Sequence, residues 1–417
     1  MSFHITIWQW VRSRYYLVVR SIAFVPAIIA VAFLLLSVVM LAIDFSDFGK
    51  TVKSTFSWVS LKDAATARSI TATIAAGTIS LLVFSFSMVM ILLNQAASAM
   101  SNRILASLIS NRFQQIVLGV YVGSIVYALF LLSTIRDVVS GIYVPALSIY
   151  MLILLTVIDV FLFIYFLHYV TQSVKYEVII ERIHKETRSA LEKHCRETCK
   201  QDNVTPPRGI DVPSPVSGYY QGFQKEDLVR FCSKHDLVVY VLPTTGAYSL
   251  KGRPFLRIVV PGAMDADLIS QCLLFFDFFN GQPIDTNPSN GFHQLKEIAI
   301  KALSPGINDP GTALLCVHAL VDLFAFRICS HPATAFPDSD GQKRVFTTEI
   351  PLQQLFNDCF LPFWDYAKND RTLMKGMKEA LLQLKTGTDD GDMFEALQAM
   401  LSTISRSISD LETTPGR

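Results

Sequence analysis

The sequence has 417 residues, of which 51% are hydrophobic and only 17% are charged, and its formal net charge is +1. This composition is too apolar for an average soluble protein, and a net charge near zero provides no broad attraction to nucleic acid. Long uncharged runs occur before about residue 171, whereas apolar and charged residues alternate after it. We therefore expect a membrane-embedded N-terminal part and a water-soluble C-terminal part.

Four windows of the N-terminal part are long enough to cross a bilayer, which needs about 20 apolar residues per helix. They cover residues 21–43, 69–94, 114–135 and 144–170. These windows predict a four-helix transmembrane domain at 21–171, preceded by an N-terminal segment at 1–20.

The orientation of these spans follows from Lys and Arg in their short flanks. On the side of the two termini lie Arg12, Arg14, Arg20, Arg103, Arg112, Lys175, Arg182, Lys185 and Arg188. The other side carries Lys50, Lys53, Lys62, Arg68 and Arg136. Because basic residues favour the inner face, we expect both termini in the cytoplasm.

Asp159 lies at the middle of the fourth window. A carboxylate at mid-bilayer costs about 2.5 kcal/mol or more on insertion scales, so this side chain must face protein or water. One interpretation is a titratable ion or proton site. The alternative is a protonated carboxyl that is hydrogen-bonded to a hydroxyl group on a neighbouring helix.

The second window carries two rows of small polar residues. One row repeats every seven residues and consists of Thr73, Ser80, Ser87 and Asn94; the other consists of Thr71, Thr78 and Ser85. A helix that is polar on two sides is expected at the centre of a bundle. We predict that the first row lines a path in an oligomer while the second packs inside the subunit. Close helix packing through small residues is the alternative for both rows.

The segment 94–115, which follows this window, has the periodicity of an amphipathic helix. We expect it to connect the membrane part mechanically to the soluble part.

The C-terminal part is expected to be a cytoplasmic α+β domain. Residues 172–200 predict a charged, solvated helical stalk, residues 201–264 a small β-rich module, and residues 265–417 a helical region. The pattern S-G-Y … G-A-Y-S-L-K-G-R-P-F between 217 and 255 resembles one half of a biotinyl/lipoyl-type β-sandwich. The hairpin that would carry a modified lysine is missing from this pattern, so no covalent cofactor is expected.

No sequence motif supports catalysis. The chain has no strand–Gly-loop–helix nucleotide motif, no HExxH and no GxSxG. His194, Cys195 and Cys199 are too few ligands for a closed zinc site. The seven cysteines are odd in number and irregularly spaced, which fits a reducing compartment. We therefore expect no enzyme activity, no metal and no cofactor.

The stretch "ALSPGINDPGTAL" (302–314) predicts a tight turn between two helices. Ser304 and Pro305 end the first helix, and Asp309 followed by Pro310 is typical of a helix start. With Gly306 and Asn308 between them, these residues form either a structural corner or an anion-binding site at a helix N-terminus.

The longer stretch "IAIKALSPGINDPGTAL" (298–314) resembles the signature of a large uncharacterised family of predicted bacterial inner-membrane proteins. Residues 84–105, 117–136, 166–174 and 216–223 extend the resemblance. It implies four spans, a cytoplasmic domain and a location in the bacterial inner membrane, and it implies no reaction. The family commonly has two adjacent histidines at the end of its fourth span, where this chain has His168 followed by Tyr169.

Two functions agree with these observations. The first is a homo-oligomeric channel or transporter-like protein that is gated by its cytoplasmic domain. The second is a membrane-anchored sensor or scaffold whose cytoplasmic domain binds a ligand or a protein partner. The expected partners are the lipid bilayer, other copies of the chain and an ion or small ligand, and no nucleic acid.

Overall fold

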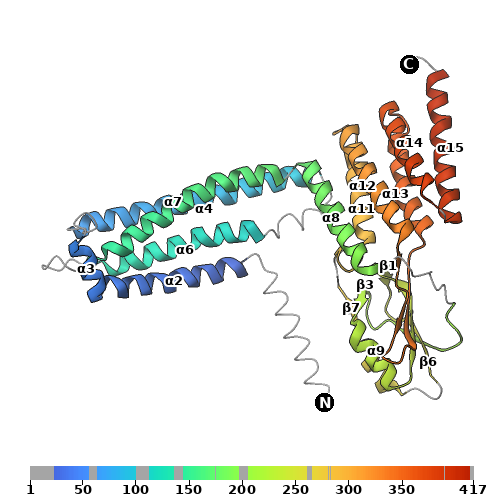
Figure 1. Ribbon diagram of the computed structural model, residues 1–417, viewed down its shortest axis with the longest axis horizontal. Coiled ribbons are helices and arrows are strands. Elements are labelled where there is room, and N and C mark those ends of the chain that lie inside the picture. The colour runs from blue at the N-terminus through green and yellow to red at the C-terminus, as the bar shows by residue number, and fades with distance from the viewer. Residues whose placement is uncertain are drawn as a thin grey trace. The chain divides into compact units, whose positions relative to one another are not determined.

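The computed structural model describes residues 23–55, 63–99, 112–135, 144–173, 175–196, 205–260, 265–279, 281, 283–388 and 390–413. The predicted N-terminal segment 1–20 and most of the connecting segment 94–115 lie outside these residues. The chain divides into two compact units, with the division at Lys175 and Tyr176 (Figure 1). The N-terminal unit holds helices α2 to α7, and the C-terminal unit holds all later elements.

The N-terminal unit is helical. It consists of α2 (Phe24–Phe45), α3 (Asp47–Thr55), α4 (Ala64–Ala99), α6 (Arg112–Thr134) and α7 (Ala146–Ser173). Among the described residues, five helices are long and apolar enough to cross a membrane. Four of them, α2, α4, α6 and α7, coincide with the four predicted windows. The fifth is α12 (Pro310–Cys329) in the C-terminal unit.

Small residues allow α2 and α6 to pack closely. Gly119 and Gly123 lie one turn apart on α6, and a Cβ atom at either position would lie 2.6 Å from a side-chain carbon of α2. These carbons belong to Ile29 and Phe33. This arrangement is the small-xxx-small packing that holds helices together where no hydrophobic driving force exists between them.

A buried carboxylate fixes the start of α7. Asp44, near the end of α2, accepts hydrogen bonds from the backbone N–H groups of Leu147 at 3.2 Å and Ser148 at 2.7 Å. The Ser148 hydroxyl donates a third, and Lys53 Nζ lies 2.6 Å from Asp44 Oδ1. Asp44 therefore caps a helix distant in sequence, because the first N–H groups of a helix have no partner within it.

The C-terminal unit contains three sheets. Its strands are β1 (Cys195–Arg196), β2 (Ile210–Pro213), β3 (Gly218–Phe223), β4 (Val238–Thr244), β5 (Tyr248–Ser249), β6 (Pro254–Val259), β7 (Phe276–Phe278), β8 (His331–Pro332), β9 (Ala335–Pro337) and β10 (Lys343–Thr348). The strand orders are β2-β6-β4-β10-β9, β5-β3-β7 and β1-β8. In the five-stranded sheet β4 and β10 pair in parallel, and the other pairs are antiparallel.

This topology corrects two predictions. Strands β7 to β10 lie in the segment 265–417 that the sequence predicted to be helical, and the β-rich part is not a separate module at 201–264. The biotinyl/lipoyl-type resemblance is not confirmed, since β10 lies beside β4 at the centre of the sheet. Val345 of β10 is fully buried in the same core as Val239 and Ile258. Apolar strands of this kind need neighbours on both sides, which a segment ending at 264 does not supply.

The helices of this unit are α8 (Tyr176–His194), α9 (Lys225–Lys234), α10 (Ala266–Leu273), α11 (Ser289–Ala302), α12, α13 (Leu352–Ala367), α14 (Arg371–Thr386) and α15 (Gly391–Thr413). Helix α8 packs against α11 and α12. It buries Ile179, Ile183 and Leu191. The predicted solvated stalk is therefore wrong, because α8 is a core helix of the C-terminal unit.

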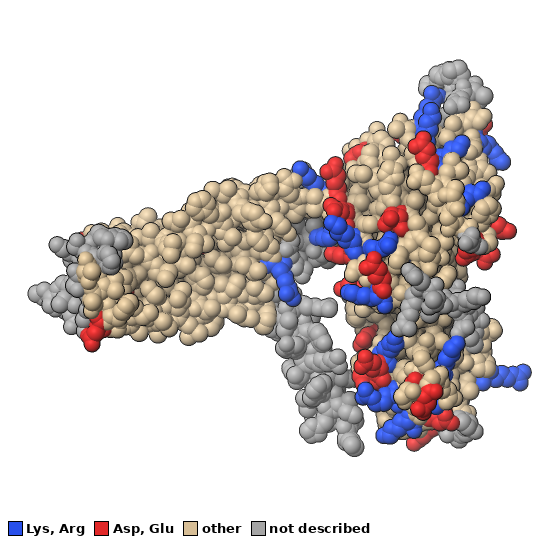
Figure 2. Space-filling view, viewed as in Figure 1, with Lys and Arg blue, Asp and Glu red and all other residues tan. Residues whose placement is uncertain are grey.

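The two units differ in surface charge. Figure 2 shows many acidic and basic side chains on the visible face of the C-terminal unit and few on the described helices α2 to α7. Apolar side chains such as Val31, Phe86 and Phe161 are more than half exposed on those helices. A surface of this kind matches a lipid environment for the N-terminal unit and water for the C-terminal unit.

Candidate functional site

A cavity of about 480 Å³ lies in the C-terminal unit, between its strands and its helices. Its walls come from the end of α8, from β3, from the first turn of α11, from the end of α12 and from the segment joining β10 to α13. Small-molecule sites in proteins commonly have this size and combine apolar walls with a few polar groups. The apolar part of the wall includes Leu191, Phe223, Phe336 and Leu355.

Arg327 is the buried cation of this cavity. It is 5% exposed, and its Nη1 donates to the Ser330 carbonyl at 2.8 Å. A guanidinium has five N–H donors and stays charged in proteins, so this single acceptor leaves most of its hydrogen-bonding capacity unused. Burial lowers the pKa of Arg327, but an arginine in a protein remains a cation.

Glu349 lines the same cavity and interacts electrostatically with Arg327. Burial raises the pKa of the Glu349 carboxyl, and the nearby Arg327 charge opposes that rise. Arg327 also interacts electrostatically with Cys195, which lines the cavity too. Burial raises the pKa of the Cys195 thiol, so this cysteine is a neutral wall residue rather than an activated nucleophile.

Two neutral side chains leave an unpaired oxygen at the cavity. The Gln221 Nε2 group donates to the carbonyls of Phe279 at 3.2 Å and Gly281 at 2.8 Å, and this fixes the amide. Gln221 Oε1 and Thr347 Oγ1 are buried and have no hydrogen-bond partner. Buried polar atoms normally have a partner, so two unpaired oxygens on residues that line the same cavity as Arg327 define a polar recognition surface.

The first turn of α11 closes one side of the cavity. Asn287 holds it in place, because its Nδ2 donates to the Thr245 carbonyl at 2.9 Å and its Oδ1 accepts from Ser289 N at 3.2 Å. Pro288 and Ser289 line the cavity at the helix N-terminus. Such an N-terminus carries partial positive charge, which adds to the charge of Arg327.

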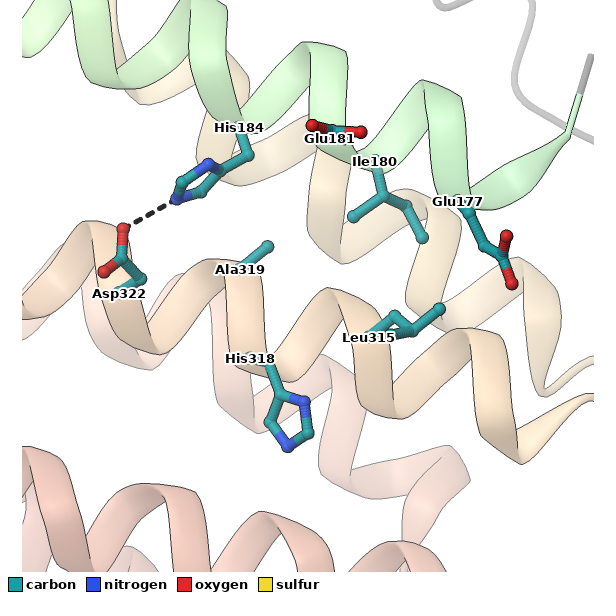
Figure 3. Close-up of a pocket in the computed structure, with 8 residues that line it drawn as sticks. All are labelled: Glu177, Ile180, Glu181, His184, Leu315, His318, Ala319 and Asp322. Carbon is teal, nitrogen blue, oxygen red and sulfur yellow. Dashed lines mark hydrogen bonds and ion pairs between the residues drawn. The ribbon is translucent and has the colours of Figure 1, made fainter. Parts of the chain in front are cut away.

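A second, more open groove lies between α8 and α12 (Figure 3). Its volume is about 570 Å³, and His184 and Asp322 bridge it at 2.7 Å. Two of its polar side chains pair with each other in this way, and a third, Glu181, pairs with Lys185. Leu315 in its wall is 41% exposed. The less open cavity at Arg327 is therefore the stronger candidate for a ligand site.

The conspicuous turn at 302–314 is a corner built on a helix cap. Asp309 Oδ1 accepts from Thr312 N at 3.0 Å, and the Thr312 hydroxyl donates to Asp309 Oδ2 at 2.6 Å. These hydrogen bonds lower the pKa of Asp309. Helix α12 begins at Pro310 as predicted, while Ser304 closes the end of α11 through the Lys301 carbonyl. Because the Asp309 carboxylate already occupies the helix N-terminus, the hydrogen bonds support the corner and not an anion site.

The predicted membrane residues fall on different surfaces. Asp159 is fully buried in the N-terminal unit, as are Thr71 and Ser85 of the second polar row. The first row, Thr73, Ser80, Ser87 and Asn94, is exposed on α4. The second row therefore packs inside the subunit, whereas the path-lining role of the first row stays a prediction.

Sequence reasoning missed the residues of the cavity. Arg327 is on α12, Gln221 is on β3, and Thr347 and Glu349 lie at and just after the end of β10, so only the fold brings these three parts of the chain together. The one local signal is Arg327 itself, a single basic residue at the end of an apolar helix. No three His, Cys, Asp or Glu side chains of the described residues gather to hold a metal ion.

These features define a class: a protein with several apolar helices suited to a membrane, followed by an α+β unit that holds a polar cavity. The chain belongs to the family described as "Predicted membrane protein (DUF2254)", whose model matches residues 19–383. The family resemblance expected from the sequence is thereby confirmed.

The chain is also similar to curated mycobacterial proteins. They include Uncharacterized protein MT1328 of Mycobacterium tuberculosis (strain CDC 1551 / Oshkosh) and Uncharacterized protein Mb1321c of Mycobacterium bovis (strain ATCC BAA-935 / AF2122/97). Each is 26% identical over 265 residues, which cover 61% of this chain and 51% of the relative. The chain thus spans about half the length of the curated relatives it matches. No solved structure matches the chain significantly.

Proposed function

We propose that this protein is a membrane-anchored receptor whose C-terminal unit binds a small polar molecule in the cavity at Arg327. The buried guanidinium with one protein acceptor carries the proposal, because a buried charge without full pairing is costly unless a ligand completes it. Helices α2, α4, α6 and α7 form the four-span anchor in a bacterial inner membrane. Both termini and the C-terminal unit lie on the cytoplasmic side.

The chemistry of the cavity selects the ligand class. Arg327 and the α11 N-terminus favour a carboxylate or phosphate group. Glu349 and the Gln221 Oε1 atom accept hydrogen bonds, so the same ligand carries N–H or O–H donors. A small organic acid with an amino, amide or hydroxyl group satisfies both requirements.

Ligand-induced stabilisation of the detergent-solubilised chain tests this function. A panel of amino acids, hydroxy acids and phosphate esters is screened for compounds that raise the unfolding temperature, since binding to the folded state alone stabilises it. Thr347→Val removes only the unpaired hydroxyl and should weaken the binding of an active compound about fivefold, as expected for one neutral hydrogen bond.

Thr348→Val is the matched control. Its hydroxyl donates to the Val241 carbonyl and does not line the cavity, so affinity should stay unchanged. A panel without any stabilising compound, or equal affinities of the Thr347→Val variant and the wild type, contradicts the ligand-binding function.

A homo-oligomeric channel is the second candidate function. It is favoured by the exposed polar row of Thr73, Ser80, Ser87 and Asn94, because polar side chains on a membrane helix are more stable against another protein chain or water than against lipid. Ion flux into liposomes that contain the purified chain tests it. Flux should fall in Ser80→Leu and persist in Val83→Leu, which changes a neighbouring exposed position.

A further inference from the structure

Four polar side chains meet inside the N-terminal unit. Ser85 comes from α4, Tyr121 and Ser124 from α6, and Asp159 from α7, and each is 0% exposed. The Ser124 hydroxyl is within hydrogen-bonding reach of the Asp159 carboxyl, and the Tyr121 hydroxyl is within reach of Ser85 and interacts electrostatically with Asp159. All five side-chain oxygens of this group lack a partner in hydrogen-bond geometry.

The bundle also contains two apolar clusters, and Tyr121 belongs to one of them. One contains Tyr127, Leu131 and Leu152, and the other contains Val117 and Phe166. Asp159 is at the middle of its 28-residue helix, so each helix end is about 20 Å away at 1.5 Å per residue. The polar cluster is therefore at the depth where polar groups are most expensive to bury.

Among the described residues of the spans, no basic side chain lies at Asp159 to neutralise a negative charge on its carboxylate. Arg68 and Arg112 lie near the first residues of α4 and α6, Lys53 pairs with Asp44, and His168 is near the end of α7. Tyr121 is the only other titratable group in the cluster. An ionised carboxylate in such surroundings needs a positive partner.

We propose that Ser85, Tyr121, Ser124 and Asp159 form an intramembrane binding site for Na⁺. One carboxylate balances one positive charge, which selects a monovalent over a divalent cation. Five hard oxygens on four side chains, from three helices, suit an alkali cation. Oxygens that bind the same cation direct their lone pairs at it and not their protons at one another. This arrangement explains why the five buried side-chain oxygens lie close together but form no hydrogen bond of good geometry.

Carbodiimide labelling of the full chain in detergent tests the site. Dicyclohexylcarbodiimide reacts with protonated carboxyls in apolar surroundings, and bound Na⁺ excludes the proton that the reaction needs. We expect Asp159 to be labelled in choline chloride at pH 6, as located by peptide mass spectrometry, and the labelling rate to fall at least fivefold in an equal concentration of NaCl. Asp159→Asn should abolish this label.

Two variants separate a cation site from a merely polar contact. Ser124→Ala should raise the NaCl concentration for half-protection about tenfold, since it removes one ligand and leaves the carboxyl in place. Thr156→Val, one turn away on α7, should leave this concentration unchanged because its hydroxyl donates to the Leu152 carbonyl of its own helix. Equal labelling rates in NaCl and choline chloride, or absence of a label at Asp159, would overturn the proposal. The outcome is independent of the Arg327 cavity, which lies in the other unit.

Discussion

At the scale of single residues, two aspartates stabilise this protein as helix caps, and they do so over different distances in the chain. Asp309 caps the helix that follows it directly, whereas Asp44 caps α7 from a different helix and also pairs with Lys53. Both satisfy N–H groups that a helix cannot satisfy by itself. The two caps differ in how many groups lose a hydrogen-bond or ion-pair partner when the carboxylate is removed.

Replacing Asp44 by Ala should destabilise the N-terminal unit by about 3 kcal/mol or more, because Lys53, the Ser148 hydroxyl and two backbone N–H groups lose their partner. The midpoint of thermal unfolding in detergent measures this loss. Ser37→Ala is the control on the same helix, since the Ser37 hydroxyl donates only to the Leu34 carbonyl of α2. If both variants unfold at the same temperature, the capping role of Asp44 is disproved.

Replacing Asp309 by Ala should lower the stability of the C-terminal unit by about 1 kcal/mol at neutral pH, as for other lost N-caps. Asp309→Asn should retain most of that stability because its amide oxygen still accepts a hydrogen bond. Because hydrogen bonding lowers the pKa of folded Asp309, its contribution is present above the ordinary aspartate pKa of about 3.9 and is lost as the pH falls through the folded value.

Urea unfolding of the wild type and both variants between pH 7 and pH 3 checks this prediction. The gap between the wild type and Asp309→Ala should shrink towards acid pH. A gap that stays constant down to pH 3 would show that the carboxylate does not act as the cap.

The cap at Asp309 was predictable from the sequence, but the cavity residues were not. The cap is local: Asp309 accepts its hydrogen bonds from Thr312, three residues later, and Pro310 takes the first helical position. A sequence pattern over four residues is therefore enough to predict it. Arg327 and Thr347 become neighbours only when α12 and β10 pack in the folded unit. Contacts of this range depend on topology, which one sequence does not reveal.

At the scale of elements, glycine determines how closely α2 and α6 approach. Gly123→Ala should destabilise the N-terminal unit by about 1–3 kcal/mol, because the added methyl group would lie 2.6 Å from the Phe33 ring and force the helices apart. Gly77→Ala on α4 is the matched control, since an added Cβ there meets nothing within 4 Å. This control should be neutral or stabilising by up to about 1 kcal/mol through higher helix propensity.

Thermal unfolding of both glycine variants in the same detergent provides the comparison. If Gly123→Ala is as stable as the wild type, α2 and α6 do not pack through this face.

Apolar periodicity predicted the existence of most helices but not their partners. Helix α8 has the charged composition of a solvated helix, yet it buries Ile180 and Ile183 against neighbouring helices. Strand β10 begins with the charged residues Lys343 and Arg344, and no strand was predicted there. Its residue Arg344 is nevertheless buried, because Asp236 and Asp338 pair with the guanidinium at 2.7 Å. A sequence pattern does not predict such a strand, because its charged residue is buried only through ion pairs that form on folding.

At the scale of the whole molecule, the sheet decides which apolar helices can cross a bilayer. Helix α12 is long and apolar enough for a membrane span, but β4 precedes it in the chain, β10 follows it, and the two strands hydrogen-bond in one sheet. Helix α11, which leads into α12, carries Lys296, Glu297 and Lys301. If α12 crossed the membrane, the paired strands would be on opposite sides, and this is impossible for a hydrogen-bonded ladder.

We therefore expect the two ends of α12 to face the same compartment. Pro305→Cys and Ser339→Cys, introduced singly into a cysteine-free chain, place thiols at exposed positions before and after α12. In intact cells both should resist a membrane-impermeant maleimide, and both should react after the membrane is permeabilised. Thr55→Cys, at the exposed end of α3 between the first two predicted spans, is the control and should react in intact cells. If Pro305→Cys and Ser339→Cys differ in accessibility, α12 is a fifth span and the sheet of the C-terminal unit cannot form as described.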